Sequence, residues 1–384
     1  MRVLIVTPPL TGHVAPLRAV AAALAESGHE VAWCGPEPAT SALSGAQLVF
    51  PAGPSEPFDV GRRPADLRGF AALRFLWQSY LIPLADAMVP GVRTACERFG
   101  PDLVLADQQA FAGPLAAKAL GIRWVTSAST GTELADPLRP WPKVADWVRQ
   151  LQHDLCGRYG VAPADLRFSP DRVLAFTIPE LTGPVSVPAV HYLGSAVTPS
   201  TMDLSWSALD GRPLVVATLG TSNTGTRFLG ECVEALSAMP EVQGVVVDPT
   251  GTLHSEDVLV VARIPQIALL RKTSALICHA GHNTVCESLA AGVPLVLAPI
   301  RDDQHTIARS VLAAGAGVRL RFDRAAAEHI GRAVGKVLAT PAHTAAARRL
   351  GRSLTSAGGA RAAVGHLEAL ERRGWPCAPT PTRR

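Results

Sequence analysis

The residues best suited to chemistry lie in one segment, residues 277–294, with the sequence ICHAGHNTVCESLAAGVP. The pattern predicts a buried strand that ends in a tight glycine turn and opens a helix, whose first backbone N–H groups can bind an anion. His279, at the carboxyl end of the strand, can donate a hydrogen bond to a phosphate oxygen, and Thr284 offers a hydroxyl to the same place. Glu287 would repel a phosphate and instead suits the hydroxyls of a ribose. The segment therefore predicts a site for a phosphorylated nucleoside.

These residues also have a purely structural interpretation. Asn283 is a common N-cap residue, and an ordinary helix could begin there. Glu287, three residues after Thr284 and expected on the first helical turn, would then be a surface charge. His282 could contact the ligand or simply belong to the turn.

Two other glycine-containing turns can be compared with known phosphate motifs. Residues 220–225 (GTSNTG) have the two-glycine spacing of a P-loop, but Thr-Arg follows where Lys-Ser/Thr is needed. Residues 7–13 contain one glycine rather than G-x-G-x-x-G, so binding of NAD is unsupported. The hydroxyl of Thr221 and the N–H groups of its turn could still contact a diphosphate.

A second pair of candidates lies in the first half of the chain. His13 follows a short apolar strand, and Asp107 ends another. Because the carboxyl ends of parallel strands meet at one edge of a sheet, both side chains could face one site. A neutral imidazole can take a proton from a hydroxyl at pH 7, and a carboxylate can fix its tautomer and stabilise the imidazolium. By itself, His13 could also be an ordinary neighbour of a helix N-cap.

The elements around these residues alternate between strands and helices. Short, uniformly apolar strands separated by helices are typical of a parallel sheet covered on both faces. The pattern restarts near residue 213, so we expect two doubly wound, Rossmann-like α/β domains facing one another across a cleft. The expected strands are residues 3–7, 30–34, 48–50, 103–106, 122–126, 173–176, 213–219, 244–247, 258–262, 275–278 and 295–298, and the expected helices are residues 14–27, 111–120, 227–238, 283–291, 304–313, 324–339 and 361–373.

The sequence also predicts where the remaining helices, loops and domains begin and end. Residues 64–99 are expected to be mostly helical, with interruptions near Pro83 and Pro90, and residues 129–143 to be an irregular loop. The expected organisation is a first domain at 1–198, a linker at 199–212, a second domain at 213–360, a helix at 361–375 and a disordered tail at 376–384.

Composition excludes several classes of protein. Of 384 residues, 48% are hydrophobic and 18% charged, which is a globular composition. Aromatic residues make up only 5%, so a stacking platform for single-stranded nucleic acid is not evident, and the net charge of +4 suits a small anionic ligand better than a polyanion. The seven cysteines form no C-x-x-C pair, and no apolar run is long enough to cross a membrane. We expect a cytoplasmic protein without a metal, a nucleic-acid partner or a membrane partner.

The segment from His279 to Pro294 resembles the donor-binding signature of the GT-B glycosyltransferases that decorate natural products, within the UDP/TDP-glycosyltransferase superfamily. Residues 263–266 (RIPQ) look like the family's x-x-Pro-Gln, which presents backbone to the nucleobase, and residues 303–304 (DQ) resemble the pair that holds the donor hexose. Residues 9–17 (PLTGHVAPL) and 101–107 (PDLVLAD) look like the segments that carry the catalytic histidine and its aspartate partner. The expected catalytic residues are thus His13 and Asp107, and the expected donor-binding residues are Gly12, Thr221, Arg263, Ile264, Gln266, His279, Gly281, His282, Asn283, Thr284, Glu287, Asp303 and Gln304.

The chain departs from the family pattern at three positions. Ile307 stands where many relatives have an asparagine, and Arg263 replaces the tryptophan of plant relatives, so any stacking on the nucleobase would be by a guanidinium. Asp302 stands where a small or neutral residue is common, and it could favour a sugar that bears an amine or be a solvated carboxylate.

The resemblance implies an inverting transfer, without metal, from a nucleoside-diphosphate sugar to an acceptor hydroxyl. It also implies that the first domain, residues 1–198, binds the acceptor, that the second, residues 213–360, binds the nucleotide sugar, and that the helix at 361–375 crosses back to the first domain. By analogy with bacterial relatives, the donor would be a dTDP-linked deoxysugar and the acceptor a polyketide, enediyne or aromatic natural product. Phe75, Trp77 and Trp141 could line the acceptor pocket, although such residues more often belong to a core. The alternatives are a nucleotide-sugar epimerase of the same fold and a non-catalytic partner of a glycosyltransferase. A homodimer is left open, and the sequence identifies neither the sugar nor the acceptor.

Overall fold

The structure is a computed structural model that describes residues 1–45, 47–58, 64, 67–197, 209–220, 223 and 225–372. Several expectations lie outside these residues: the donor contact of Thr221, most of the linker at 199–212, the end of the helix at 361–375, and the tail at 376–384.

Within the described residues, seven parallel strands form a sheet in the order β3-β2-β1-β4-β5-β6-β7. Val6 of β1 lies opposite Cys34 of β2 on one side and Ala106 of β4 on the other. The chain winds away in opposite directions from β1 and β4, so their carboxyl ends flank the crevice where doubly wound sheets bind ligands. The strands are β1 (Arg2–Val6), β2 (Glu30–Glu37), β3 (Leu48–Pro54), β4 (Leu103–Asp107), β5 (Arg123–Ala128), β6 (Val173–Ala175) and β7 (Val190–Tyr192).

A second parallel sheet, of six strands in the described chain, has the order β10-β9-β8-β11-β12-β13. Cys278 of β11 lies opposite Thr218 of β8, so the equivalent crevice lies beyond the carboxyl ends of these two strands. The expected fold of two doubly wound α/β domains is confirmed. The strands are β8 (Leu214–Thr218), β9 (Gln243–Val247), β10 (Leu259–Val261), β11 (Thr273–Cys278), β12 (Leu295–Leu297) and β13 (Gly317–Arg319).

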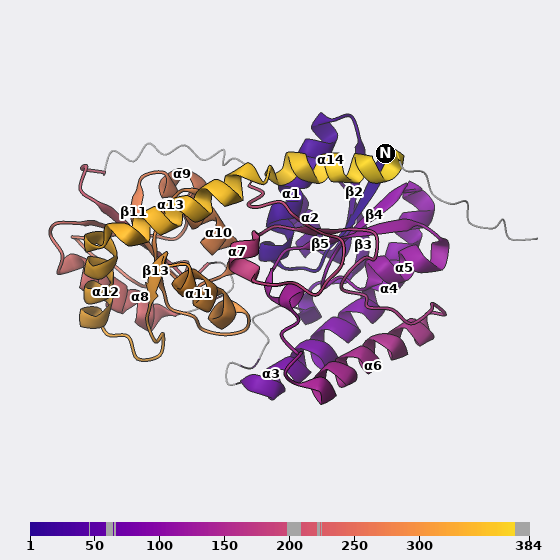
Figure 1. Ribbon diagram of the computed structural model, residues 1–384, viewed down its shortest axis with the longest axis horizontal. Coiled ribbons are helices and arrows are strands. Elements are labelled where there is room, and N and C mark those ends of the chain that lie inside the picture. Colours follow the sequence, from indigo (N-terminus) through magenta and orange to yellow (C-terminus); the bar gives the residue numbers. More distant parts are fainter. Residues whose placement is uncertain are drawn as a thin grey trace, which may run out of the picture. The chain divides into compact units, whose positions relative to one another are not determined.

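Helices connect the strands of both sheets (Figure 1). Those connected to the first sheet are α1 (Thr11–Glu26), α2 (Ala39–Ser44), α3 (Gly69–Arg74), the π-helix η3 (Phe75–Leu81), α4 (Ile82–Phe99), α5 (Ala112–Leu120), α6 (Pro142–Arg158) and α14 (Gly359–Arg372), with 3₁₀ turns η1 (Glu56–Phe58) and η4 (Thr132–Ala135). The others are α7 (Pro179–Thr182), α8 (Thr226–Ser237), α9 (Gln266–Leu270), α10 (His282–Ala290), α11 (Gln304–Ala313), α12 (Ala327–Ala339) and α13 (Pro341–Ser356).

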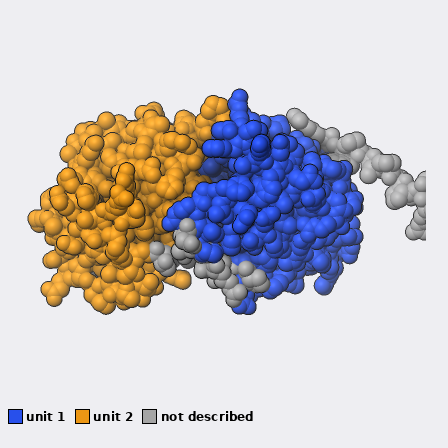
Figure 2. Space-filling view, turned by 90° about the horizontal axis from the view of Figure 1, so that it is seen from below, with its two compact units in different colours: residues 1–176, 185–196, 358–384 blue, residues 177–184, 197–357 orange. Residues whose placement is uncertain are grey.

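The chain divides into two compact units, which Figure 2 shows in different colours. The first comprises residues 1–176, 185–196 and 358–384, and the second comprises residues 177–184 and 197–357. Residues 177–184 thus belong to the second unit, whereas the expected boundary places them in the first. The helix α14 belongs to the first unit, where its Val364 and Leu367 pack in one cluster with Val20 and Leu24 of α1.

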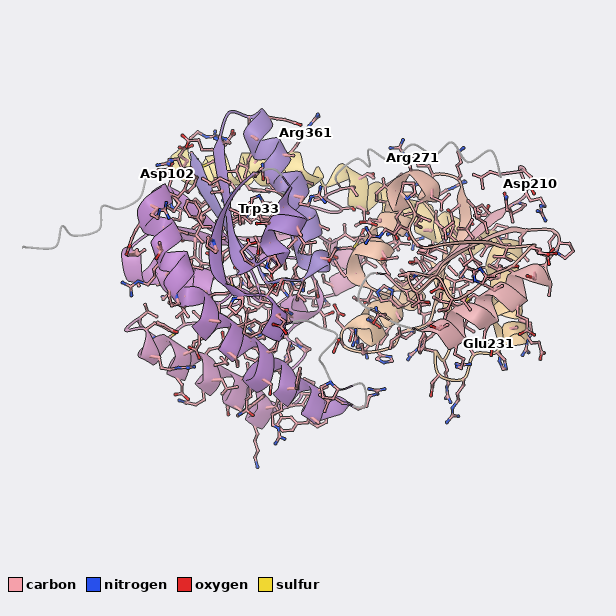
Figure 3. All side chains as sticks on the ribbon, turned by 180° about the vertical axis from the view of Figure 1, so that it is seen from behind. Trp33, Asp102, Asp210, Glu231, Arg271 and Arg361 are labelled. Carbon is pink, nitrogen blue, oxygen red and sulfur yellow. The ribbon has the colours of Figure 1, made fainter. Side chains whose placement is uncertain are left out.

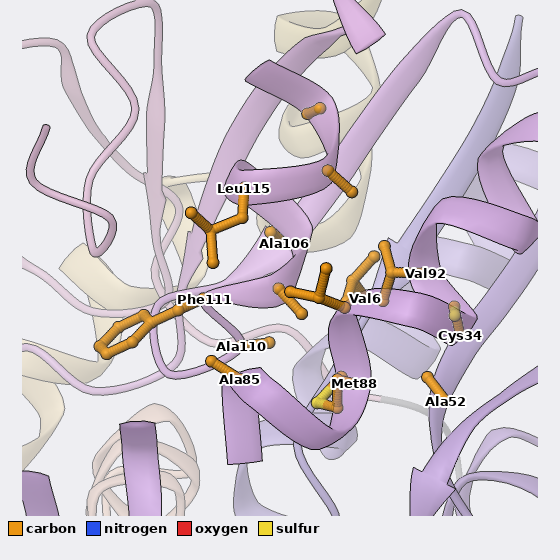
Figure 4. Packing of buried hydrophobic residues seen from close by; sticks show 14 of the residues in the cluster. Val6, Cys34, Ala52, Ala85, Met88, Val92, Ala106, Ala110, Phe111 and Leu115 are labelled. Atoms are coloured by element: carbon orange, nitrogen blue, oxygen red, sulfur yellow. The ribbon is translucent and has the colours of Figure 1, made fainter. Parts of the chain in front are cut away.

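Apolar side chains cover both faces of the first sheet. On one face, Val6 and Ala106 pack against Met88, Phe111 and Leu115 of the flanking segments (Figure 4). On the other face, strand residues pack against α1 and α14. Burying one large apolar side chain contributes roughly 1.5–3 kcal/mol, which explains why these strands read as continuous apolar runs.

Charged side chains lie mostly at the surface of each unit. In Figure 3, Trp33 lies inside the first unit, where it is fully buried, while Asp102 and Arg361 are exposed at the surface of that unit. Among the described residues, no helix has both the length and the apolar stretch that crossing a membrane requires.

The structure corrects two helix predictions. Residues 82–99 form one helix, α4, which continues without interruption through Pro90. Near Pro83 the helix does change: the π-helix η3 ends at Leu81, and α4 begins with Pro83 in its first turn, where no helical N–H bond is needed. The segment 129–143, expected to be an irregular loop, is partly helical, because η4 lies within it and α6 begins at Pro142.

Candidate active site

Three polar side chains meet at the carboxyl edge of the first sheet. His13 lies in the first turn of α1, just beyond β1; Asp107 is the last residue of β4; and Ser129 directly follows β5. Because β1, β4 and β5 are neighbours in the sheet, their carboxyl ends bring these residues together. The two residues predicted from sequence, His13 and Asp107, are therefore in contact, and Ser129 joins them.

The three side chains form a closed set of hydrogen bonds. Nδ1 of His13 lies 2.9 Å from Oδ1 of Asp107, and Oγ of Ser129 lies 2.7 Å from both Nδ1 of His13 and Oδ2 of Asp107. The backbone N–H of Gln109 also donates to Oδ1 of Asp107, at 2.9 Å. The Asp107 side chain is fully buried, whereas 14% of the His13 side chain is exposed. The carboxylate is thus held rigidly, and the imidazole remains accessible.

This arrangement selects one tautomer of His13. A carboxylate only accepts hydrogen bonds, so the hydroxyl of Ser129 donates to Asp107 and turns its lone pair toward Nδ1 of His13. With acceptors on both sides, Nδ1 carries the proton, and the lone pair of the neutral ring is on Nε2. That nitrogen can take a proton from a hydroxyl. Ser129 was not predicted from the sequence. The one feature that could have indicated it is its position directly after β5, the strand that neighbours β4 in the sheet.

A second group of candidates surrounds the carboxyl end of β11 in the second unit. The ring of His279 lies so close to Gly220 and Gly281 that a Cβ at either position would overlap it. His279 is 7% exposed, and its Nδ1 has no hydrogen-bond partner in the described residues. Burial, assisted by the charge of Arg301, lowers the pKa of His279 to about 4. At pH 7 the ring is therefore neutral and has one N–H to donate.

The helix that follows His279 begins two residues earlier than it would if Asn283 were its N-cap residue. Gly281 is the N-cap residue of α10, in extended conformation, and His282 is the first helical residue. Asn283 is therefore not the N-cap, and Glu287 lies in the second turn of α10 rather than the first. Thr284 is buried near the start of the helix. Nε2 of His282 lies 3.6 Å from Sγ of Cys286, one turn further along α10.

Glu287 is held by Gln266, another residue that the sequence predicts to bind the nucleotide sugar. Nε2 of Gln266, the first residue of α9, donates a hydrogen bond to Oε2 of Glu287. Burial raises the pKa of Glu287 to about 7, and the bond from Gln266 opposes that rise. Nearby, Ile264 packs against the core of the second unit, whereas Arg263 is exposed. The structure thus places residues 263–266, the x-x-Pro-Gln motif, beside α10.

The predicted Asp303–Gln304 pair opens α11. Oε1 of Gln304 accepts hydrogen bonds from the backbone N–H groups of Ile300 and Arg301, at 2.8 and 3.0 Å, and so holds the preceding turn. Asp303 is the N-cap residue of α11, and Asp302 has a positive φ of 54° in that turn. The contact of Gln304 with a hexose stays a prediction, for which its amide nitrogen is the relevant atom.

The three acceptor candidates lie in different environments. Trp77 is 2% exposed, and the centroid of its ring lies 5.5 Å from that of Phe111, so Trp77 belongs to the core of the first unit. The expectation that Trp77 lines an acceptor pocket is therefore wrong. Trp141, just before α6, is 64% exposed, and Phe75 is half-buried at the start of the π-helix. A cavity of about 650 Å³ in the first unit is lined, in the described chain, by other residues. Gly12 is exposed beside His13 in the first turn of α1.

The chain is similar to known glycosyltransferases over most of its length. Residues 230–353 match the family model described as "UDP-glucoronosyl and UDP-glucosyl transferase". The 4'-demethylrebeccamycin synthase of Lentzea aerocolonigenes is 30% identical over 409 residues, which cover 91% of this chain and 94% of that protein. Elloramycin glycosyltransferase ElmGT of Streptomyces olivaceus is 30% identical over 351 residues, covering 83% of this chain and 85% of that protein.

Solved structures with the same fold include the glycosyltransferase of kitacinnamycin, with a TM-score of 0.79 and 23% identity over 96% of this chain and 98% of that one. Spinosyn rhamnosyltransferase SpnG complexed with thymidine diphosphate has a TM-score of 0.77 and 24% identity over 96% of this chain and 100% of that one.

Proposed function

Because this chain belongs to the UDP-glucoronosyl and UDP-glucosyl transferase family, and is a GT-B glycosyltransferase of antibiotic pathways, we propose that it transfers a sugar from a dTDP-linked donor to a hydroxyl of an aromatic, polyketide or enediyne acceptor, with inversion. As a glycosyltransferase it uses a nucleotide-sugar donor and a small-molecule acceptor. The presence of thymidine diphosphate in the structure of SpnG supports the dTDP donor.

One observation carries the mechanism: the hydrogen bonds of Asp107 and Ser129 place the proton of His13 on Nδ1. Nε2 of His13 then takes the proton of the acceptor hydroxyl while the oxygen of that hydroxyl attacks the anomeric carbon of the donor sugar. The new C–O bond forms as the bond to the nucleoside diphosphate breaks, so the anomeric configuration inverts. Asp107 stabilises the imidazolium that results, and loss of the proton to solvent returns His13 to its starting state.

Residues of the second unit would hold the donor. The neutral ring of His279 donates its N–H to the diphosphate, and the first N–H groups of α10 add the partial positive charge of a helix N-terminus. Glu287, oriented by Gln266, accepts hydrogen bonds from the ribose hydroxyls. Charge on the diphosphate grows as it leaves, so the contacts from His279 and α10 strengthen toward the transition state.

The proposed function is tested by mass spectrometry of the purified protein with dTDP-sugars, UDP-sugars and hydroxylated aromatic aglycones. A glycoside should form fastest with a dTDP-sugar, and NMR should show the anomeric configuration opposite to that of the donor. Retention of configuration would contradict the mechanism. An isomerised sugar nucleotide in the absence of acceptor would favour the epimerase alternative.

The affinity for the donor is expected to rise with pH in a way that depends on Glu287. With a pKa of about 7, Glu287 is mostly protonated at pH 6 and mostly ionised at pH 8, and the ionised carboxylate is the better acceptor for ribose hydroxyls. The Kd of dTDP-glucose, measured by calorimetry, should therefore fall by up to about tenfold between these pH values. Glu287→Gln should remove this change. Equal pH dependence in both proteins would contradict the assignment of Glu287 to the ribose.

Sugar transfer is also expected to survive removal of divalent metal ions. His279 and the N-terminus of α10 can stabilise the leaving diphosphate without a bridging cation. Initial rates after dialysis against excess EDTA should stay within about twofold of the untreated enzyme, since the stabilising groups belong to the protein. A rate that collapses in EDTA and returns only with added Mg²⁺ or Mn²⁺ would refute this expectation.

A further inference from the structure

Among the Phe, Trp and Tyr side chains of the described residues, only two are exposed, and both lie on or next to one pair of helices in the first unit. Phe70, on α3, is 54% exposed, and Trp141, the residue before α6, is 64% exposed. The ring of Phe70 packs against that of Trp147 on α6, with centroids 5.5 Å apart, so α3 and α6 lie side by side (Figure 1). The two helices therefore share an apolar patch, and exposed patches of this kind are typical of binding surfaces.

Positive side chains lie on the same helix faces as these rings. Arg74 lies four residues after Phe70 on α3, and Lys143 lies four residues before Trp147 on α6. Residues four apart are neighbours on one face of a helix. Lys143 is also in the first turn of α6, where a positive charge is unfavourable and no acidic residue offsets it. The stability of α6 therefore does not explain Lys143.

The positive charges around the patch are not neutralised by ion pairs. Arg74, Arg139 and Lys143 are exposed, and none of them forms an ion pair with a described residue. A solvated cation keeps its full attraction for an anionic surface. The patch therefore combines exposed rings with available positive charge.

Two acidic residues lie close to these cations in the sequence. Asp146, on α6, forms an ion pair with Arg149 at 2.6 Å, and Asp136 lines the cavity of about 650 Å³ in the first unit. Neither pairs with a cation of the patch. We call the following residues the aromatic–basic surface: Phe70, Arg74, Arg139, Trp141, Lys143 and Trp147.

We propose that the aromatic–basic surface binds a membrane that contains anionic lipids. Tryptophan and phenylalanine rings bind at the level of the lipid headgroups, and lysine and arginine are attracted to anionic headgroups. A protein partner fits less well because lysine is depleted in protein interfaces, and a nucleic acid fits less well because three cations neutralise few phosphates. The sequence predicts no membrane partner, since Phe70 and Trp147 are far apart in the chain and only the fold brings them together. The inference goes beyond the proposed function and does not depend on it.

The test measures binding of the full chain to lipid vesicles by sedimentation at low salt. Vesicles of phosphatidylcholine with about one third phosphatidylglycerol should bind the protein roughly 10- to 100-fold more tightly than vesicles of phosphatidylcholine alone, because each cation near an anionic surface contributes about fivefold. Added salt should weaken the binding, since it screens the attraction between the cations and the headgroups.

Single substitutions show whether the aromatic–basic surface is responsible. Phe70→Ser and Trp141→Ser should each weaken vesicle binding at least about fivefold, because each removes a ring that leaves water on binding. Lys143→Gln should weaken binding to the anionic vesicles about fivefold. The matched controls are Leu48→Ser, whose side chain is also 54% exposed, and Lys336→Gln, at an exposed lysine of α12, and both should bind like the wild type. Thermal melts check that every variant is folded.

The proposal is wrong if anionic vesicles bind the wild-type protein no more tightly than neutral ones, or if Phe70→Ser and Trp141→Ser bind them normally. Light scattering without lipid and fluorescence anisotropy with a single-stranded oligonucleotide test other occupants of the surface. A dimer or an oligonucleotide complex that Trp141→Ser disrupts, in a protein that does not bind vesicles, would assign the surface to that partner and overturn the proposal. None of these measurements involves sugar transfer, so their failure leaves the proposed function standing.

Discussion

The variant His13→Ala is expected to lose roughly 10²- to 10⁴-fold in kcat with an alcohol acceptor, the range typical of general-base catalysis. Without the imidazole, the acceptor hydroxyl must lose its proton to water as its oxygen attacks. The KM for the donor should change little, because the expected donor contacts are centred on the second unit. Steady-state kinetics with a dTDP-sugar, together with a thermal melt that shows a folded protein, measure both effects.

The partners of His13 give this prediction its controls. Ser129→Ala should cost less, about tenfold, because Asp107 still accepts from Nδ1 of His13. Adding either Ser129→Ala or Asp107→Ala to His13→Ala should cost almost nothing further, since there is no ring left to orient. A phenol that ionises unaided would hide the effect, so an alcohol acceptor is essential. Near wild-type turnover of the alcohol by His13→Ala would eliminate His13 as the base.

The contact between His13 and Asp107 could be predicted because both follow apolar strands of one parallel sheet. Their place at strand ends implies a shared edge. Ser129 could not be predicted in the same way. Its role depends on β5 being the neighbour of β4 and on the direction of its side chain, and a serine in a loop carries no periodic signal.

The helix α4 shows where local rules fail. A proline inside a helix costs about 3 kcal/mol, which justifies an expected interruption at Pro90. The helix buries Leu84, Met88 and Val92 in the core of the first unit, and each contributes roughly 1.5–3 kcal/mol. Packing therefore outweighs the lost hydrogen bond. The burial of Trp77 has the same cause, because only the folded core shows which aromatic side chains it encloses.

Around the carboxyl end of β11, the sequence predicted the order of the elements better than their exact bounds. The turn after β11 and the helix behind it were expected, but α10 begins at His282, which moves Glu287 to the second turn. The hydrogen bond from Gln266 to Glu287 joins residues of two different motifs, 21 positions apart in the sequence. No spacing rule predicts such a contact, because it depends on how α9 packs beside α10.

Substituting His279 by alanine is expected to lower kcat by about 10²-fold, the usual cost of removing one hydrogen-bond donor from developing negative charge. The affinity for the donor should fall less, because the charge on the diphosphate grows only as the sugar is transferred. His279→Gln, which restores an N–H group, should recover part of the rate. His254→Ala, an exposed histidine of the same unit, should behave like the wild type.

The pH dependence of kcat shows whether His279 acts as a neutral hydrogen-bond donor or as a positive charge. With its pKa lowered to about 4 by burial, His279 is neutral throughout the range from pH 6 to pH 9. The ratio of kcat between the wild type and His279→Ala should therefore be constant over that range. If His279 acted as a cation, the ratio would be largest at low pH and would approach one as the ring lost its proton. A constant ratio near one would show instead that the ring only supports the turn formed by Gly220 and Gly281.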